Sequence, residues 1–167
     1  MTGLSNTMND GGRVLAIAAA SGRVGHVLLE AGRVVDLGMS RKASSGQTEA
    51  RAYAAEQIEV LRPDVIVTER LVRRSKKGEK TRAIIGAITS VADVADVQNA
   101  EIVRGRSYQN RFDEAADLVE RYPEMRPYLP DVRKPWEAEP KALIYFEALS
   151  LVESLFGMPL PTHRDKS

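Results

Sequence analysis

The spacing of apolar residues first changes close to residue 47, and no other feature constrains the fold as much. Before this point, short apolar runs over 14–17, 24–29 and 33–39 are joined by tight turns, which predicts three strands of an antiparallel meander. After it, apolar residues recur at intervals of three and four, which predicts a helix over 47–61. A chain that changes period in this way is expected to build a sheet with helices packed on its faces.

The second half of the chain alternates between the two periods. Pro63 ends the first helix, and the continuous apolar run Val65-Ile66-Val67 predicts a buried strand over 64–68. Residues 123–140 hold five of the eight prolines and are expected to be irregular. The other expected elements are a helix over 81–95, a strand over 101–103, a helix over 110–122 and a last helix over 140–156. The expected fold class is therefore α/β, with a mixed five-stranded sheet and flanking helices.

Composition limits the chemistry that this chain can perform. Its 167 residues are 43% hydrophobic, which is enough for one compact domain, expected over 13–156 between a flexible leader (1–12) and a flexible tail (157–167). Cysteine is absent and the two histidines are His26 and His163, so any metal would have to be held by carboxylates. Without a membrane-spanning run or a signal-like apolar start, the expected compartment is the cytoplasm.

Four segments of the chain carry a resemblance to a known family. They are residues 14–22 (VLAIAAASG), 62–69 (RPDVIVTE), 81–91 with Gly86, and 147–151 (EALSL). In this order and spacing they resemble the RuvC-type Holliday-junction resolvases of the ribonuclease-H-like superfamily, over about residues 13–156. The resemblance implies the ribonuclease-H-like fold.

The resemblance also implies two-metal hydrolysis of a phosphodiester, with Mg²⁺ or Mn²⁺ held by carboxylates. It assigns Glu69, after the fourth strand, and Glu147, in the last helix, to the metal site, with Glu139 as a further catalytic candidate. The chain departs from the family at Ala18, which replaces the first-strand Asp and offers no ligand. Two carboxylates brought together without a metal repel each other, so we expect the pKa of one of them to be raised.

Each candidate carboxylate has a second interpretation. Glu69 also fits the solvated end of a strand. Glu147, with Ser150 and Ser154, also fits the exposed stripe of an amphipathic helix. Glu139 precedes the last helix, where an acid favours the helix dipole.

Basic residues cluster directly after Glu69. Seven of them fall within residues 70–82, balanced by Glu79 alone, and a looser group follows the strand expected over 101–103. Such clusters are either solvated loops or sites that neutralise the phosphates of a nucleic acid. The candidate nucleic-acid-binding residues are Arg70, Arg73, Arg74, Lys76, Lys77, Lys80, Arg82, Arg104 and Arg106.

Two main functions remain open from the sequence, beside a structural or oligomerisation domain that binds no ligand. The first is a resolvase-like nucleic-acid-binding protein that acts as a metal-dependent endonuclease on branched or structured DNA. The second is a catalytically inactive ribonuclease-H-like module that binds nucleic acid or a protein partner, which explains Ala18 directly. The resemblance also implies a homodimer through the helix over 81–95, with Gly86 allowing close approach of the partner backbone.

Overall fold

The computed structural model describes residues 12–73, 75–104, 111–131 and 140–157. Its strands are β1 (Arg13–Ala20), β2 (Arg23–Glu30), β3 (Arg33–Ser40), β4 (Val65–Glu69) and β5 (Gln98–Ile102). Its helices are the 3-10 helices η1 (Lys42–Ser45) and η2 (Pro123–Tyr128), and the α-helices α2 (Gln47–Leu61), α3 (Glu79–Val94), α4 (Arg111–Arg121) and α5 (Leu143–Gly157). Within these ranges, no helix combines the length and the apolar character needed to span a membrane.

The five strands form one mixed sheet in the order β3-β2-β1-β4-β5. The first three strands are antiparallel neighbours, whereas β4 and β5 run parallel to β1. β1 lies beside β4 with Val14 opposite Val65 and Ala16 opposite Val67. The expected fold class and the expected pairing of the first and fourth strands are therefore confirmed.

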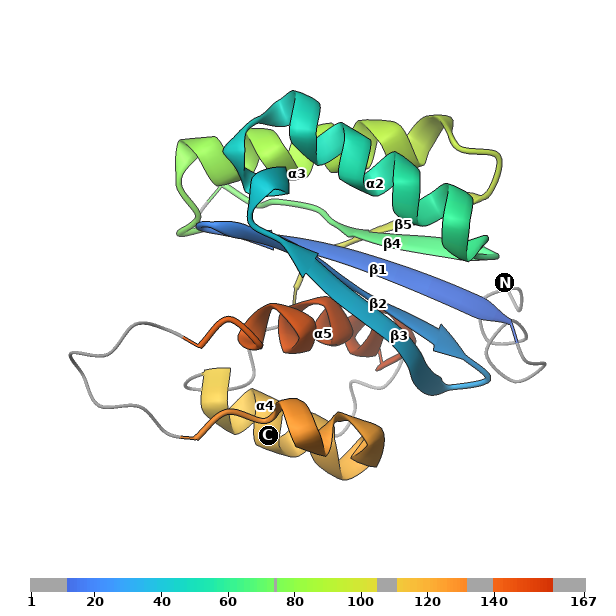
Figure 1. Ribbon diagram of the computed structural model, residues 1–167, viewed down its shortest axis with the longest axis vertical. Helices are drawn as coiled ribbons and strands as arrows, with labels where there is room; N and C mark the ends of the chain where they lie inside the picture. Colours follow the sequence, from blue (N-terminus) through green and yellow to red (C-terminus); the bar gives the residue numbers. More distant parts are fainter. Residues whose placement is uncertain (1–11, 74, 105–110, 132–139, 158–167) are drawn as a thin grey trace.

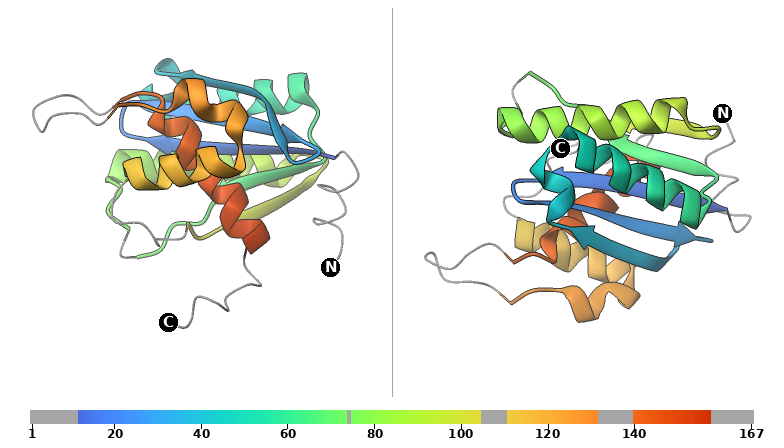
Figure 2. Two further views of the ribbon diagram at one scale, coloured as in Figure 1. Left: turned by 90° about the horizontal axis from the view of Figure 1, so that it is seen from below. Right: turned by 45° about the horizontal axis from the view of Figure 1, so that its top comes forward.

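Helices cover both faces of the sheet: α2 and α3 lie on one face, and α4 and α5 on the other (Figures 1 and 2). β1 is buried from Val14 to Ala20, with alternate residues entering the core of each face. Leu15 and Ile17 pack toward α2 and α3, whereas Ala16 and Ala18 belong to the core against α5. A central strand covered on both sides needs apolar residues at every position, as its sequence has.

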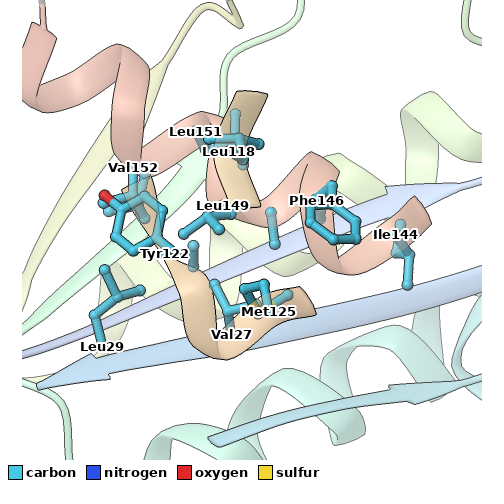
Figure 3. Packing of buried hydrophobic residues seen from close by; sticks show 14 of the residues in the cluster. Val27, Leu29, Leu118, Tyr122, Met125, Ile144, Phe146, Leu149, Leu151 and Val152 are labelled. Atoms are coloured by element: carbon cyan, nitrogen blue, oxygen red, sulfur yellow. The ribbon is translucent and has the colours of Figure 1, made fainter. Parts of the chain in front are cut away.

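The core beneath the sheet is built from segments far apart in the sequence. Figure 3 shows Val27 and Leu29 of β2 among side chains of α4, η2 and α5. Phe146 and Leu149 of α5 are fully buried there, as is Met125 of η2. This packing fixes α5 against the sheet, which determines where its polar residues lie.

Several of the expected boundaries of strands and helices were wrong. β5 begins at Gln98, three residues before the expected strand, because an edge strand carries polar side chains that hide its pattern. α5 begins at Leu143 rather than at residue 140, and residues 123–128 form η2 rather than an irregular loop. The predicted leader and tail lie outside the described residues, apart from Gly12 and Gly157.

Gly25 controls how closely α5 approaches the sheet. A Cβ at this position of β2 would lie 2.8 Å from Cγ2 of Ile144 and 3.3 Å from the carbonyl oxygen of Gly38. We predict that Gly25→Ala lowers the free energy of unfolding by about 1–3 kcal/mol through overpacking. Urea unfolding of Gly25→Ala, Ile144→Ala and the double variant checks this. The glycine substitution should cost less when Ile144 is already shortened, and equal costs in both backgrounds would contradict the packing argument.

Candidate functional site: two buried glutamates joined by a lysine

The parallel strands place the candidate site at one edge of the sheet. β1, β4 and β5 all end at this edge, so Glu69, the last residue of β4, lies near the end of β1 at Ala19 and Ala20. α5 crosses the face below the sheet (Figure 1), and its Glu147 lies at the same edge, since the side chain of Lys77 contacts both Glu147 and Glu69. Both glutamates are buried, Glu147 to 1% exposure. The structure thus brings together the two carboxylates that the sequence singled out, and the exposed-stripe interpretation of Glu147 is wrong.

The ammonium group of Lys77 lies between the two carboxylates. Its Nζ donates to Oε1 of Glu69 at 2.8 Å, to the carbonyl oxygen of Ala19 at 2.8 Å, and to Oε2 of Glu147. A lysine ammonium carries three N–H donors, so this group is fully used. The sequence grouped Lys77 with the basic loop, and its spacing gave no signal that it would turn inward.

Glu147 is held in its ionised form by the cations around it. Burial alone would raise the pKa of this carboxyl, but Lys77, Arg104 and Arg111 together hold it below its ordinary value. Nη2 of Arg111 lies 3.5 Å from Oε1 of Glu147, an oxygen with no hydrogen-bond partner among the described residues. The expectation that two neighbouring carboxylates raise a pKa is therefore wrong for Glu147, because a lysine separates them.

A second group of polar contacts fixes the elements around Glu147. Arg104 donates through Nε to Oγ of Ser150 at 2.8 Å and through Nη2 to Oε1 of Glu114 at 2.5 Å. Ser150 in turn donates to the main-chain carbonyl of Glu147 at 2.7 Å. Burial raises the pKa of Glu114, although Arg104 opposes the shift. Arg104 therefore joins α4 and α5 to the segment that follows β5.

Arg82 folds the loop that carries Lys77. Its guanidinium donates to the main-chain carbonyls of Lys77 and of three loop residues, at 3.1–3.3 Å: Val72, Arg73 and Ser75. These contacts gather the loop around one side chain of α3. The candidate binding residues Lys77, Arg82 and Arg104 are thus engaged by groups of the protein itself.

The remaining described candidates face solvent. Arg70, Arg73, Lys76 and Lys80 are exposed. Beside them lies a cleft of about 300 Å³ whose charged lining residues are Glu69, Arg70, Lys76, Lys77, Arg104 and Arg111. Arg74, Arg106 and Glu139 lie outside the described residues.

These residues do not fit the metal centre that the resemblance implies. Among the residues that the structure describes, no group of three or more Asp, Glu, His or Cys side chains could hold a metal ion. Ala18 provides no carboxylate, and the ammonium of Lys77 already lies against both glutamates. A two-metal site needs several carboxylates converging on the ions, and the part of this edge that the structure describes supplies two, those of Glu69 and Glu147.

Solved structures of the same architecture exist. Thermus thermophilus RuvC aligns with 13% sequence identity and a TM-score of 0.53 over 84% of this chain and 95% of that chain. The same protein in complex with a Holliday junction substrate aligns with 15% sequence identity and a TM-score of 0.54, over 90% of this chain and 97% of that chain. The chain has the ribonuclease-H-like resolvase fold.

A viral protein shares the fold as well. The Fowlpox virus resolvase in complex with Holliday junction DNA aligns at 15% identity and a TM-score of 0.51, over 86% of this chain and 98% of that chain. No protein-family model matches the sequence, and no curated protein does. The likeness is therefore one of three-dimensional structure, at identities that show the fold alone.

The pKa of Glu147 is lower in the folded chain than its ordinary value. Its ionised carboxylate therefore stabilises the fold at pH values above the ordinary pKa, and this stabilisation is lost as the pH falls through the lowered pKa of the folded chain. We predict that Glu147→Gln lowers the free energy of unfolding by about 3–5 kcal/mol at pH 7. The difference from the unaltered chain should shrink below a pH of about 4.5. Urea unfolding from pH 7 to pH 3 measures this. Glu59→Gln, on the exposed side of α2, serves as control. A difference in the free energy of unfolding between Glu147→Gln and the unaltered chain that stays constant with pH would contradict the role of the Glu147 charge.

Proposed function

We propose that this chain binds the phosphate backbone of branched or structured DNA through the cleft at the ends of β1, β4 and β5, and that it does so without metal-dependent cleavage. The observation that carries the proposal is the charge of the cleft. Among the described residues, five cationic side chains line it, against one carboxylate, that of Glu69: Arg70, Lys76, Lys77, Arg104 and Arg111.

Internal pairing accounts for only part of this charge. Lys77 neutralises the buried glutamates and Arg104 pairs with Glu114, whereas Arg70 and Lys76 remain exposed at the rim, with Arg73 nearby in the same loop. Arg70 lies 4.0 Å from Glu101, a distance at which an exposed pair contributes little. Exposed cations beside a cleft are suited to neutralising phosphates, which position a nucleic acid without reading its sequence.

The solved structures support DNA as the ligand and a branched form of it. Thermus thermophilus RuvC and the Fowlpox virus resolvase share this fold and are both described in complex with a Holliday junction. The absence of cleavage rests on the site itself, where Ala18 lacks a carboxylate and Lys77 lies between Glu69 and Glu147.

We predict that replacing Arg70 and Lys76 with Ala weakens binding to a four-way DNA junction and lowers its dependence on salt. Each phosphate contact contributes about 0.9 to the slope of log K against log salt concentration, so the slope should fall by roughly 1–2. Fluorescence anisotropy of a labelled four-way junction between about 50 and 300 mM salt measures the slope.

The matched control replaces two exposed arginines away from the cleft, Arg33 at the start of β3 and Arg126 in η2. This variant should keep the affinity and the slope of the unaltered chain. An unchanged slope in the cleft variant would contradict the binding site. Junction cleavage by the unaltered chain in Mg²⁺ or Mn²⁺ would contradict the inactive site and favour the endonuclease.

We further propose that the chain forms a homodimer through the exposed side of α3. The isoleucines of this helix, for example Ile84 and Ile88, are buried in the protomer's own core, whereas Val94 at its end is exposed. Along the middle of the helix a partner would therefore meet the small exposed residues Gly86 and Ser90. A Cβ at Gly86 would meet nothing within 4 Å, which leaves the space beside this helix open.

We predict that Gly86→Leu converts the dimer to a monomer without unfolding it, because the side chain would fill the contact but disturb nothing in the protomer. Sedimentation at micromolar concentration measures the mass. The control Ala52→Leu, on an exposed position of α2, should leave the dimer intact. A monomeric unaltered chain would rule out this assembly.

A further inference from the structure

The oxygen atoms around Lys77 are those of a cation site. Two carboxylate oxygens, from Glu69 and Glu147, and one main-chain carbonyl oxygen, from Ala19, converge on one ammonium nitrogen. Carboxylate and main-chain carbonyl oxygens are also the ligands that Mg²⁺ and Ca²⁺ take in proteins. The lysine therefore occupies a place that an inorganic cation could otherwise fill.

The burial of this pair makes a cation necessary. The side chains of Glu69 and Glu147 are 9% and 1% exposed, and an ionised carboxylate taken out of water needs a compensating charge. Lys77 supplies one positive charge, and Arg111, 3.5 Å from Glu147, supplies a second. Together they carry the charge of one divalent ion against the two carboxylates.

The loop holds the lysine in place. Arg82 binds the main-chain carbonyl of Lys77 and those of three neighbours, and the main-chain N–H of Lys77 donates to Oγ of Ser75 at 3.3 Å. The side chain of Lys77 is 16% exposed, so water has little access to its ammonium. Its three donors are all used within the protein, which leaves none for another ligand.

We propose that Lys77 is a built-in substitute for a divalent cation, and that removing its ammonium turns Glu69, Glu147 and the carbonyl of Ala19 into a divalent-cation site. This edge then differs from a metal centre in two ways: Ala18 provides no carboxylate, and Lys77 takes the place of the metal ion. The chain carries its own cation, and its fold is independent of added metal.

The test compares the melting temperature of the unaltered chain and of Lys77→Met in EDTA and in Mn²⁺. Met keeps much of the length of the side chain but leaves the two carboxylates without their ammonium. The unaltered chain should melt at the same temperature, within 1 °C, in both solutions. Lys77→Met should melt lower in EDTA. Mn²⁺ at about ten times its dissociation constant should raise the folded-to-unfolded ratio of the variant about elevenfold, a rise of roughly 3–6 °C.

Two further variants make the result specific. Lys76→Met removes an adjacent exposed lysine and should behave as the unaltered chain does in both solutions. Lys77→Met combined with Glu147→Gln removes one buried charge, so it should melt higher than Lys77→Met in EDTA and lose the response to Mn²⁺.

If Lys77→Met does not fold in EDTA, circular dichroism follows the same titration, and refolding by Mn²⁺ that the double variant does not show supports the proposal. Equal stabilisation of the unaltered chain and Lys77→Met by Mn²⁺ would overturn it, as would a Lys77→Met chain that shows no response to Mn²⁺. No DNA is present in these experiments, so their failure would not bear on DNA binding, and a failure to bind DNA would not bear on them.

Discussion

The contact between one ammonium and two buried carboxylates connects most parts of this molecule. Lys77 reaches the end of β1 through Ala19, the end of β4 through Glu69, and α5 through Glu147. Each of these groups would be costly to bury alone, because a charge removed from water needs a partner. The three-way contact therefore depends on the sheet, the helix below it and the loop all being in place, and it links them in return.

The packing beneath the sheet makes that contact possible. Ala18 and Gly25 lie opposite each other on β1 and β2, on the face that α5 covers. These small residues let the helix lie close to the sheet, where Ile144 fills the space above Gly25. The same alanine that provides no metal ligand thus contributes to the close approach that brings Glu147 to the site. Packing and chemistry at this edge are determined by the same residues.

The basic residues of the chain divide into two groups with different roles. Lys77, Arg82 and Arg104 are bound by carboxylates, carbonyls and a hydroxyl of the protein, and they hold the loop, α4 and α5 together. Arg70 and Lys76 are exposed beside the cleft. The first group stabilises the edge of the sheet, and the second gives that edge the positive charge on which the proposed DNA binding rests.

The sequence by itself determined the architecture. Continuous apolar runs mark strands buried on both faces, as over Val65-Ile66-Val67, and the change of period near residue 47 marks where helices begin to cover the sheet. It also singled out Glu69 and Glu147, because the parallel strands and the last helix of the resembled family bring those positions together. The start of the edge strand β5 was predicted less accurately, since its polar and half-buried residues lack the apolar pattern that marks a buried strand.

Only the tertiary structure decided what lies between the two glutamates. In the sequence, Lys77 is one of seven basic residues within residues 70–82, and nothing in their spacing distinguishes a buried ammonium from an exposed one. Whether Lys77 is buried depends on two contacts. Arg82 binds the main-chain carbonyl of Lys77, 5 positions away in the sequence, and Glu147, 70 positions away, accepts a hydrogen bond from its ammonium. A charged side chain can be buried only where the fold provides its partners. Those partners come from distant parts of the chain, so the local sequence pattern does not reveal them.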